Sequence, residues 1–243
     1  MNWTDYPVFN AKNFSNEFHL EEPQAGILLV HKPLEWTSFD VVKFTRSRIK
    51  RKKVGHAGTL DPMAEGLLVL CFGKATKTID QIQSQTKEYI ARIQFGSSTL
   101  SYDAETEVDE EASFEHIDLS SISTCLEEQF QGDILQVPPM YSALKRDGKK
   151  LYELARKGKK IELEARQITI YSTDILSFGE GILQLKVRCS KGTYIRSLAH
   201  DLGEALGSKA HLSGLTRTKI GEFSTHEAIS LDVIKDLNLS GND

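Results

Sequence analysis

One polar loop, from Val54 to Gly66, holds the residues of this sequence that are best suited to chemistry. It contains three glycines, His56 and the pair Asp61-Pro62, and it leads directly into an apolar run. Pro62 biases Asp61 toward an extended backbone and has no N–H to donate, so the loop can hold the carboxylate at a defined angle. The glycines let a ligand or another backbone approach closely. An aspartate before proline also forms ordinary turns, so these residues alone leave both a turn and a catalytic carboxylate open.

Helix and strand patterns flank this loop and must position it. A capping pattern at Thr37 to Asp40, followed by apolar residues at helical spacing, predicts a helix from about Ser38 to Lys50. The unbroken apolar run from Leu67 to Phe72 predicts a strand buried on both faces. The patterns also predict strands at 26–30, 89–95 and 183–189, a helix at 195–206 and a short helix around 231–237. Because strands and helices alternate irregularly and without a repeat, the sequence predicts an α+β fold.

The chain of 243 residues shows no linker that would divide it. We expect an N-terminal extension over residues 1–25, which lacks clear periodicity, and one domain over residues 26–243. No apolar run approaches the roughly 20 residues of a membrane-spanning helix, and the first residues do not resemble a secretory signal. The three cysteines are far apart in the sequence, which indicates buried thiols in a cytoplasmic protein, with no disulfide framework and no metal site.

Charge is segregated along the chain, although 30 basic and 34 acidic side chains give a net charge of only −4. Basic residues gather at Lys43–Lys53 and at Lys145–Lys160, whereas Asp103–Glu128 contains ten acids and no lysine or arginine. Such segregation suits a protein with one positive face for phosphates and an acidic segment that points away from them. Each basic run on its own is equally compatible with a solvated surface.

Five sequence blocks follow one another over roughly residues 26 to 223. They read Val-His-Lys-Pro with Trp-Thr-Ser at 30–38, Gly-His-Ala-Gly-Thr-Leu-Asp-Pro with the following glycine-rich blocks at 55–77, Lys-Glu-Tyr at 87–89, Gln-Val-Pro-Pro-Met-Tyr-Ser-Ala-Leu-Lys at 136–145, and Cys-Ser-Lys-Gly-Thr-Tyr-Ile-Arg-Ser-Leu at 189–198. In this order they closely resemble the bacterial tRNA pseudouridine synthase B family. The family's pseudouridine synthase fold implies a mainly antiparallel mixed sheet with flanking helices.

The resemblance implies isomerisation of a uridine to pseudouridine, normally at position 55 in the TΨC arm of tRNA. The base leaves the ribose through N1, rotates, and rejoins C1′ through C5, so neither a cofactor nor a metal is implied. A carboxylate can attack C1′, as in retaining glycosidases, or assist loss of the C2′ proton. The sequence does not choose between these two routes.

The matching positions imply roles for five residues. Asp61 is the family's essential aspartate at the sugar, and Arg196 is the arginine that pairs with it. Tyr89 is the tyrosine that stacks on the target base and accepts or relays the C5 proton. His56 is the histidine that enters the RNA loop and helps hold the nucleotide out of its stack. Tyr194 precedes Arg196 by two residues on what resembles a strand end, so both side chains are expected to face one cleft.

Three further matches, Lys32, Lys145 and Arg217, are expected to bind the RNA or support the scaffold. Thr216 stands where the family usually has an arginine, so only Arg217 is carried over from that block. The accessory C-terminal RNA-binding domain of many relatives is expected to be missing or vestigial. We expect a monomer that acts on the TΨC stem-loop without an obligate protein partner or a membrane. The alternatives are a non-catalytic tRNA-binding or tRNA-folding module and an unrelated glycosyl hydrolase, which would use a pair of carboxylates.

Overall fold

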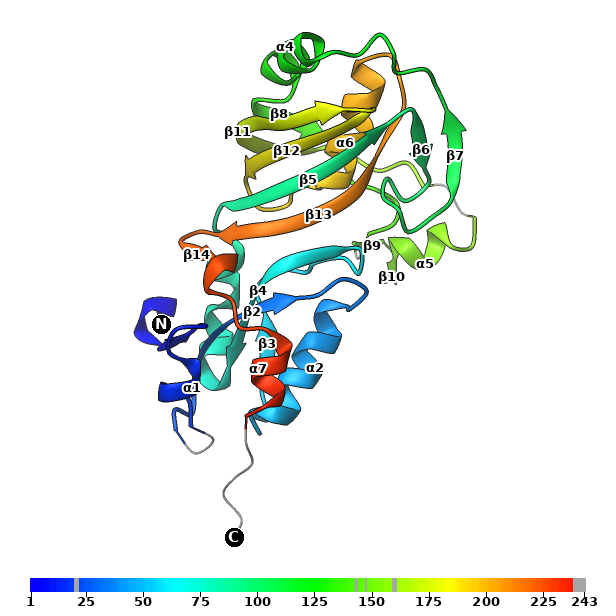
Figure 1. The fold of residues 1–243 in the computed structure, drawn as a ribbon. Coiled ribbons are helices and arrows are strands. Elements are labelled where there is room, and N and C mark those ends of the chain that lie inside the picture. The colour runs from blue at the N-terminus through cyan, green and yellow to red at the C-terminus, as the bar shows by residue number, and fades with distance from the viewer. Residues whose placement is uncertain (20–21, 143, 147, 159–160, 238–243) are drawn as a thin grey trace. The chain divides into compact units, whose positions relative to one another are not determined.

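The computed structural model describes residues 1–19, 22–142, 144–146, 148–158 and 161–237 (Figure 1). The chain forms two compact units, the first of residues 1–89 and 216–243 and the second of residues 90–215. Two strands, β5 (Lys87–Phe95) and β13 (Ala210–Ile220), have residues in both units. The domain boundary predicted near residue 25 remains a prediction.

The first unit combines a sheet with short helices. Its other strands are β1 (Val8–Phe9), β2 (Gly26–Lys32), β3 (Val54–His56), β4 (Ala64–Phe72) and β14 (Phe223–Ser224). Its helices are α1 (Phe14–Glu17), α2 (Ser38–Arg48), α3 (Ile79–Gln83) and α7 (Leu231–Lys235), with the 3-10 helices η1 (Trp3–Asp5), η2 (Gly73–Thr78) and η3 (Thr225–Glu227). β2 and β3 pair antiparallel with β4, β14 pairs antiparallel with β13, and β1 pairs parallel with β2.

Strands β2 and β4 are buried on both faces, which confirms the prediction from the apolar run. One face packs in a cluster with apolar residues of α2 and α7, and the strand residues in it are Leu28, Val30, Leu68, Leu70 and Phe72. The other face packs in a second cluster, with strand residues Ile27, Leu29, Leu67, Val69 and Cys71. Such strands read as continuous apolar runs because neither face meets water. The loop that carries Asp61 therefore begins and ends on rigid elements.

Helix α2 starts where the capping pattern predicts. The Thr37 side chain accepts a hydrogen bond from the backbone N–H of Asp40, and the Asp40 carboxylate accepts one from the N–H of Thr37 at 3.0 Å. These bonds satisfy two N–H groups that the first turn leaves unpaired. The helix ends at Arg48, and Lys50 has a left-handed φ of 50° just beyond it.

The N-terminal residues belong to the core of the first unit, which the sequence pattern did not indicate. Phe9, Phe14 and Phe18 are 1–3% exposed, and they pack in the same cluster as Phe72 of β4. The rings of Phe9 and Phe18 meet edge to face with centroids 5.2 Å apart. The three phenylalanines come from a short strand, one helical turn and the residue after it, so no single period connects them.

The second unit holds the remaining elements. Its strands are β6 (Ser97–Thr99), β7 (Val108–Glu111), β8 (Gly132–Gln136), β9 (Lys145–Arg146), β10 (Lys149–Lys150), β11 (Arg166–Gly179) and β12 (Ile182–Cys189), and its helices are α4 (Leu119–Gln129), α5 (Leu151–Ala155) and α6 (Ile195–Ala205). β11 lies between β8 and β12, antiparallel to both. Alternate residues of β12, from Leu183 to Cys189, are fully buried, as predicted.

The fold is thus α+β with a mixed, mainly antiparallel sheet, as the sequence and the resemblance predicted. Within the part of the chain that the structure describes, every helix is too short or too polar to cross a membrane.

Candidate active site

Asp61 lies in the loop between β3 and β4, and hydrogen bonds hold this loop at several points. The Ser38 hydroxyl, at the start of α2, donates to the carbonyl of Leu60 at 3.0 Å and accepts from its N–H at 2.8 Å. The N–H of Glu35 donates to the carbonyl of Pro62 at 2.9 Å. Asp61 is half-buried between these two anchors. Its carboxylate therefore stands on a fixed backbone and is not sealed in the apolar interior.

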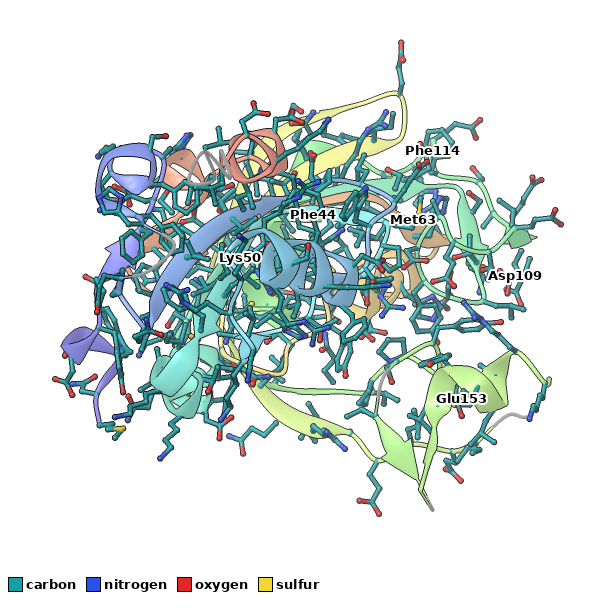
Figure 2. The ribbon with its side chains drawn as sticks, turned by 90° about the horizontal axis from the view of Figure 1, so that it is seen from below. Phe44, Lys50, Met63, Asp109, Phe114 and Glu153 are labelled. Atoms are coloured by element: carbon teal, nitrogen blue, oxygen red, sulfur yellow. The ribbon has the colours of Figure 1, made fainter. Side chains whose placement is uncertain are left out.

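Figure 2 labels Met63, which lies in the Asp61 loop two residues after Asp61 and is 37% exposed. It also labels Lys50, which follows the end of α2. Lys50 belongs to the basic cluster predicted to bind phosphates. In the same cluster Arg51 is half-buried and donates to the carbonyl of Pro23 at 3.0 Å, whereas Lys52 and Lys53 are exposed.

Tyr89 and Arg217, both in the first unit, are in contact with each other. Tyr89 is 9% exposed on β5, and its hydroxyl forms a hydrogen bond with the guanidinium of Arg217. Arg217, on β13, is 1% exposed. Burial lowers the pKa of Arg217, and the hydroxyl of Tyr89 and the charge of Asp61 act in the opposite direction. Because Arg217 is buried, its side chain is not placed for the direct contact with RNA that the resemblance implied.

Lys32 at the end of β2 is also buried, with 0% of its surface exposed. Its ammonium group donates to the carbonyls of Pro33 at 2.8 Å and Trp36 at 2.6 Å. Burial lowers the pKa of Lys32 to about 8, although the charges of Asp61 and Glu65 raise it. These contacts support the scaffold alternative for Lys32 and leave its predicted phosphate contact unsupported.

His56 ends β3, five residues before Asp61, and is partly exposed. Burial lowers the pKa of His56, the charge of Arg217 acts in the same direction, and a hydrogen bond with the backbone of Gly58 opposes them. The imidazole is therefore mainly neutral at pH 7. A neutral ring is easier to desolvate among nucleobases than a cation.

Arg196 lies in the second unit, in the first turn of α6. Its Nη1 donates to the carbonyls of Ser101 at 3.1 Å and Tyr141 at 2.9 Å, and its Nε lies 3.5 Å from Oδ2 of Asp103. Both side chains of this ion pair are about 95% buried, with 5% and 4% exposed. The predicted pairing of Arg196 with Asp61 concerns residues of two different units and remains a prediction.

Asp103 is a buried partner of Arg196 that the sequence pattern does not indicate. It belongs to the acidic segment that was expected to point away from RNA, but it is 3% exposed and pairs with Arg196. The Ser101 hydroxyl also donates to its carboxylate at 2.6 Å. The charge pattern gave no signal that would separate this buried acid from its exposed neighbours.

The structure corrects the prediction for Tyr194. β12 ends at Cys189, and Tyr194 is the N-cap residue of α6, so it does not lie at a strand end. The alternation of side chains along a strand therefore does not connect Tyr194 with Arg196, so the argument that they share a cleft no longer applies. Gln136 of β8 bonds both backbone groups of Tyr194, at 3.0 and 2.8 Å. Lys145 lies in β9, paired with Lys150, and its predicted role remains a prediction.

The profile described as the TruB family pseudouridylate synthase N-terminal domain matches residues 46–195, which include Asp61, Tyr89 and Tyr194. The chain belongs to this family. Residues 196–242 match the tRNA pseudouridylate synthase B C-terminal domain. The resemblance predicted from the five blocks is thus confirmed.

Proteins named tRNA pseudouridine synthase B are similar to nearly the whole chain. The protein from Parabacteroides distasonis is 48% identical over 86% of this chain and 92% of its own length, and that from Flavobacterium johnsoniae is 45% identical over 88% and 96%. Among solved structures, a Cbf5-Nop10-Gar1 complex contains a chain with 28% identity and a TM-score of 0.67, matched over 97% of this chain and 60% of that one. The archaeal box H/ACA Nop10-Cbf5 complex gives 26% identity and a TM-score of 0.65, over 89% and 56%. The chain therefore spans little more than half of those structural relatives.

Proposed function

We propose that this protein isomerises uridine to pseudouridine at position 55, in the TΨC arm of tRNA, with Asp61 acting at the ribose. Family membership makes the protein an isomerase that forms pseudouridine in tRNA. The choice of uridine and the role of Asp61 are the parts that we propose. The observation that supports both parts is the position of Asp61. It is half-buried, its neighbours Leu60 and Pro62 are hydrogen-bonded to Ser38 and Glu35, and it lies inside the block that matches the family.

The reaction breaks the N1–C1′ bond and forms a C5–C1′ bond, and one proton moves from C5 to N1 overall. Asp61 has two routes to assist cleavage. It can attack C1′ to form a glycosyl ester that the rotated base displaces, or it can remove the C2′ proton and later return it. A carboxylate on a fixed backbone serves either route because it meets the sugar without reorganisation.

Tyr89 and His56 are proposed to hold the extruded base and to handle its C5 proton, which Asp61 at the ribose does not do. A uridine inside a folded loop must leave its stack before its C1′ can be reached. His56, neutral and partly exposed, takes the place that the base leaves, and the ring of Tyr89 stacks against the extruded base. The hydroxyl of Tyr89 is the candidate to accept or relay the C5 proton, its oxygen taking up this proton as its own O–H proton is passed on toward N1. The protein acts as a monomer in the cytoplasm, where its tRNA substrate is found.

Asp61→Asn tests the proposal against unmodified tRNA transcripts. The wild-type protein should form pseudouridine at one uridine of the TΨC loop, read by carbodiimide treatment and primer extension. The amide can neither attack C1′ nor remove a proton, so we expect the single-turnover rate to fall by at least about a thousandfold. Affinity for tRNA should stay within about threefold.

The matched control is Asp80→Asn, which removes an exposed carboxylate from the first turn of α3. It should keep activity within about twofold. Full activity of Asp61→Asn would refute the role of the carboxylate. A wild-type protein that binds tRNA without forming pseudouridine would favour the non-catalytic module, and modification elsewhere in tRNA would refute the choice of position.

A further inference from the structure

Arg217 is a cation buried where no phosphate can reach it. It is the largest of the fully buried side chains among the described residues, and 1% of its surface is exposed. A guanidinium in the protein interior is unfavourable unless hydrogen bonds replace its water. The partners that replace the water therefore indicate what the residue does.

Three backbone carbonyls accept hydrogen bonds from Arg217. Its Nη2 donates to Gly58 at 3.1 Å and its Nη1 to Thr59 at 3.3 Å, and both residues precede Asp61 in the loop. Its Nε donates to Leu67 of β4 at 2.8 Å, on the other side of Asp61. Because the guanidinium is planar and rigid, these bonds fix the start of the loop relative to the strand that follows it.

Two loop glycines fit closely around Arg217. Gly58 has a φ of 106°, and a Cβ atom there would lie 3.5 Å from Nη1 of Arg217. Gly66 has a φ of 102°, and a Cβ atom there would lie 2.5 Å from the carbonyl oxygen of Arg217. The glycines that made this loop stand out in the sequence therefore let the backbone approach Arg217.

Arg217 also connects the loop to Tyr89. The guanidinium has only donors, so the hydroxyl oxygen of Tyr89 accepts the hydrogen bond between them. One buried side chain is thus bonded both to the loop of Asp61 and to the tyrosine proposed to handle the C5 proton.

We propose that Arg217 is a positioning residue for the isomerisation. Its hydrogen bonds hold the Asp61 loop and the Tyr89 hydroxyl in one fixed frame, in which their relative positions do not change while the base rotates. It touches neither the RNA nor the reacting atoms. The role rests on the proposed function for its effect on rate, but the frame itself is a property of the free protein. A displacement of about 1 Å at a reacting group lowers rates by about a hundredfold, so loosening this frame should slow the chemistry.

The test compares Arg217→Lys with the wild-type protein in three measurements. Lysine keeps the charge but cannot bond three carbonyls and a hydroxyl in one plane. We expect a single-turnover rate about a hundredfold lower and an affinity for tRNA within about threefold. In the free protein, hydrogen exchange of the amides of Thr59, Leu60, Asp61 and Met63 should be about tenfold faster, with unchanged exchange in β2.

The matched control is Lys219→Met, two residues along β13, where the ammonium is half-exposed and lies 3.6 Å from Glu88. All three measurements should stay within about twofold of the wild type.

The other outcomes overturn the proposal. If the single-turnover rate of Arg217→Lys is unchanged, the reaction does not need the frame. If hydrogen exchange in the Asp61 loop of this variant is unchanged, Arg217 does not hold the loop. A parallel loss of tRNA affinity indicates an RNA contact. If Arg217→Lys and Arg217→Gln both fail to fold, the guanidinium supports the whole unit and has no specific role at the loop. A wild-type protein without activity defeats the proposed function, and hydrogen exchange then still decides whether the frame exists.

Discussion

Replacing Gly66 by alanine should destabilise the first unit through two separate effects. The residue has a φ of 102°, a backbone conformation that costs an L-residue about 1–2 kcal/mol. In addition, the new Cβ would lie 2.5 Å from the carbonyl oxygen of Arg217 and 3.0 Å from its nitrogen. Because both atoms are backbone, β13 or the loop must move, at about 2 kcal/mol. The sum is about 3–4 kcal/mol.

Thermal unfolding followed by circular dichroism measures this sum. In a protein of this size 1 kcal/mol shifts the melting temperature by about 2–4 °C, so Gly66→Ala should melt about 10 °C below the wild type. The protein offers two controls. Gly192 has a φ of 86° with no atom within 4 Å of a Cβ, so Gly192→Ala should show backbone strain alone, a fall of about 3–5 °C. Gly179 has neither feature, and Gly179→Ala should melt within about 2 °C of the wild type.

The comparison of Gly66→Ala with Gly192→Ala separates the cost of the close approach to Arg217 from the cost of backbone strain. If Gly66→Ala and Gly192→Ala lower the melting temperature equally, the close approach of Arg217 contributes nothing to stability. Gly66→Ala should also slow pseudouridine formation, because it displaces the backbone that carries the guanidinium.

Two other predictions concern the pH dependence of stability and the RNA surface. Burial raises the pKa of Asp201 to about 6, and the charge of Glu204 adds to it, whereas the unfolded value is near 3.8. Ionisation of Asp201 therefore opposes folding, fully above pH 6 and not at all below pH 3.8. Asp201→Asn should melt above the wild type at pH 8 and together with it at pH 3.5; an equal difference at both pH values would contradict this assignment. Replacing Lys50, Lys52 and Lys53, three exposed lysines of the basic run Lys43–Lys53, by glutamine should weaken tRNA binding and reduce the slope of log affinity against log salt by about 2. Arg51 is retained because its guanidinium donates a hydrogen bond to the carbonyl of Pro23. An unchanged slope would show that these lysines do not contact the RNA.

Local sequence patterns determined the secondary structure around the site. The capping residues before Ser38 fixed the start of α2, and the apolar run to Phe72 fixed a strand buried on both faces. Both follow from interactions between residues a few positions apart. The Asp61 loop was recognisable for the same reason, since its glycines and proline restrict the backbone locally. The family resemblance then supplied the reaction that no local pattern contains.

Only the tertiary structure decided which charged residues are buried and with what they pair. Arg217 and Lys32 look like surface cations in the sequence, and Asp103 looks like one of ten acids, yet all three are buried. Arg217 bonds carbonyls 150 to 159 positions away, and Arg196 pairs with Asp103 across 93 positions. Composition and spacing carry no record of such distant contacts, because the energy that holds a buried charge comes from whichever groups the fold brings to it. The sequence by itself determined the carboxylate and its rigid loop, and the fold determined what surrounds them.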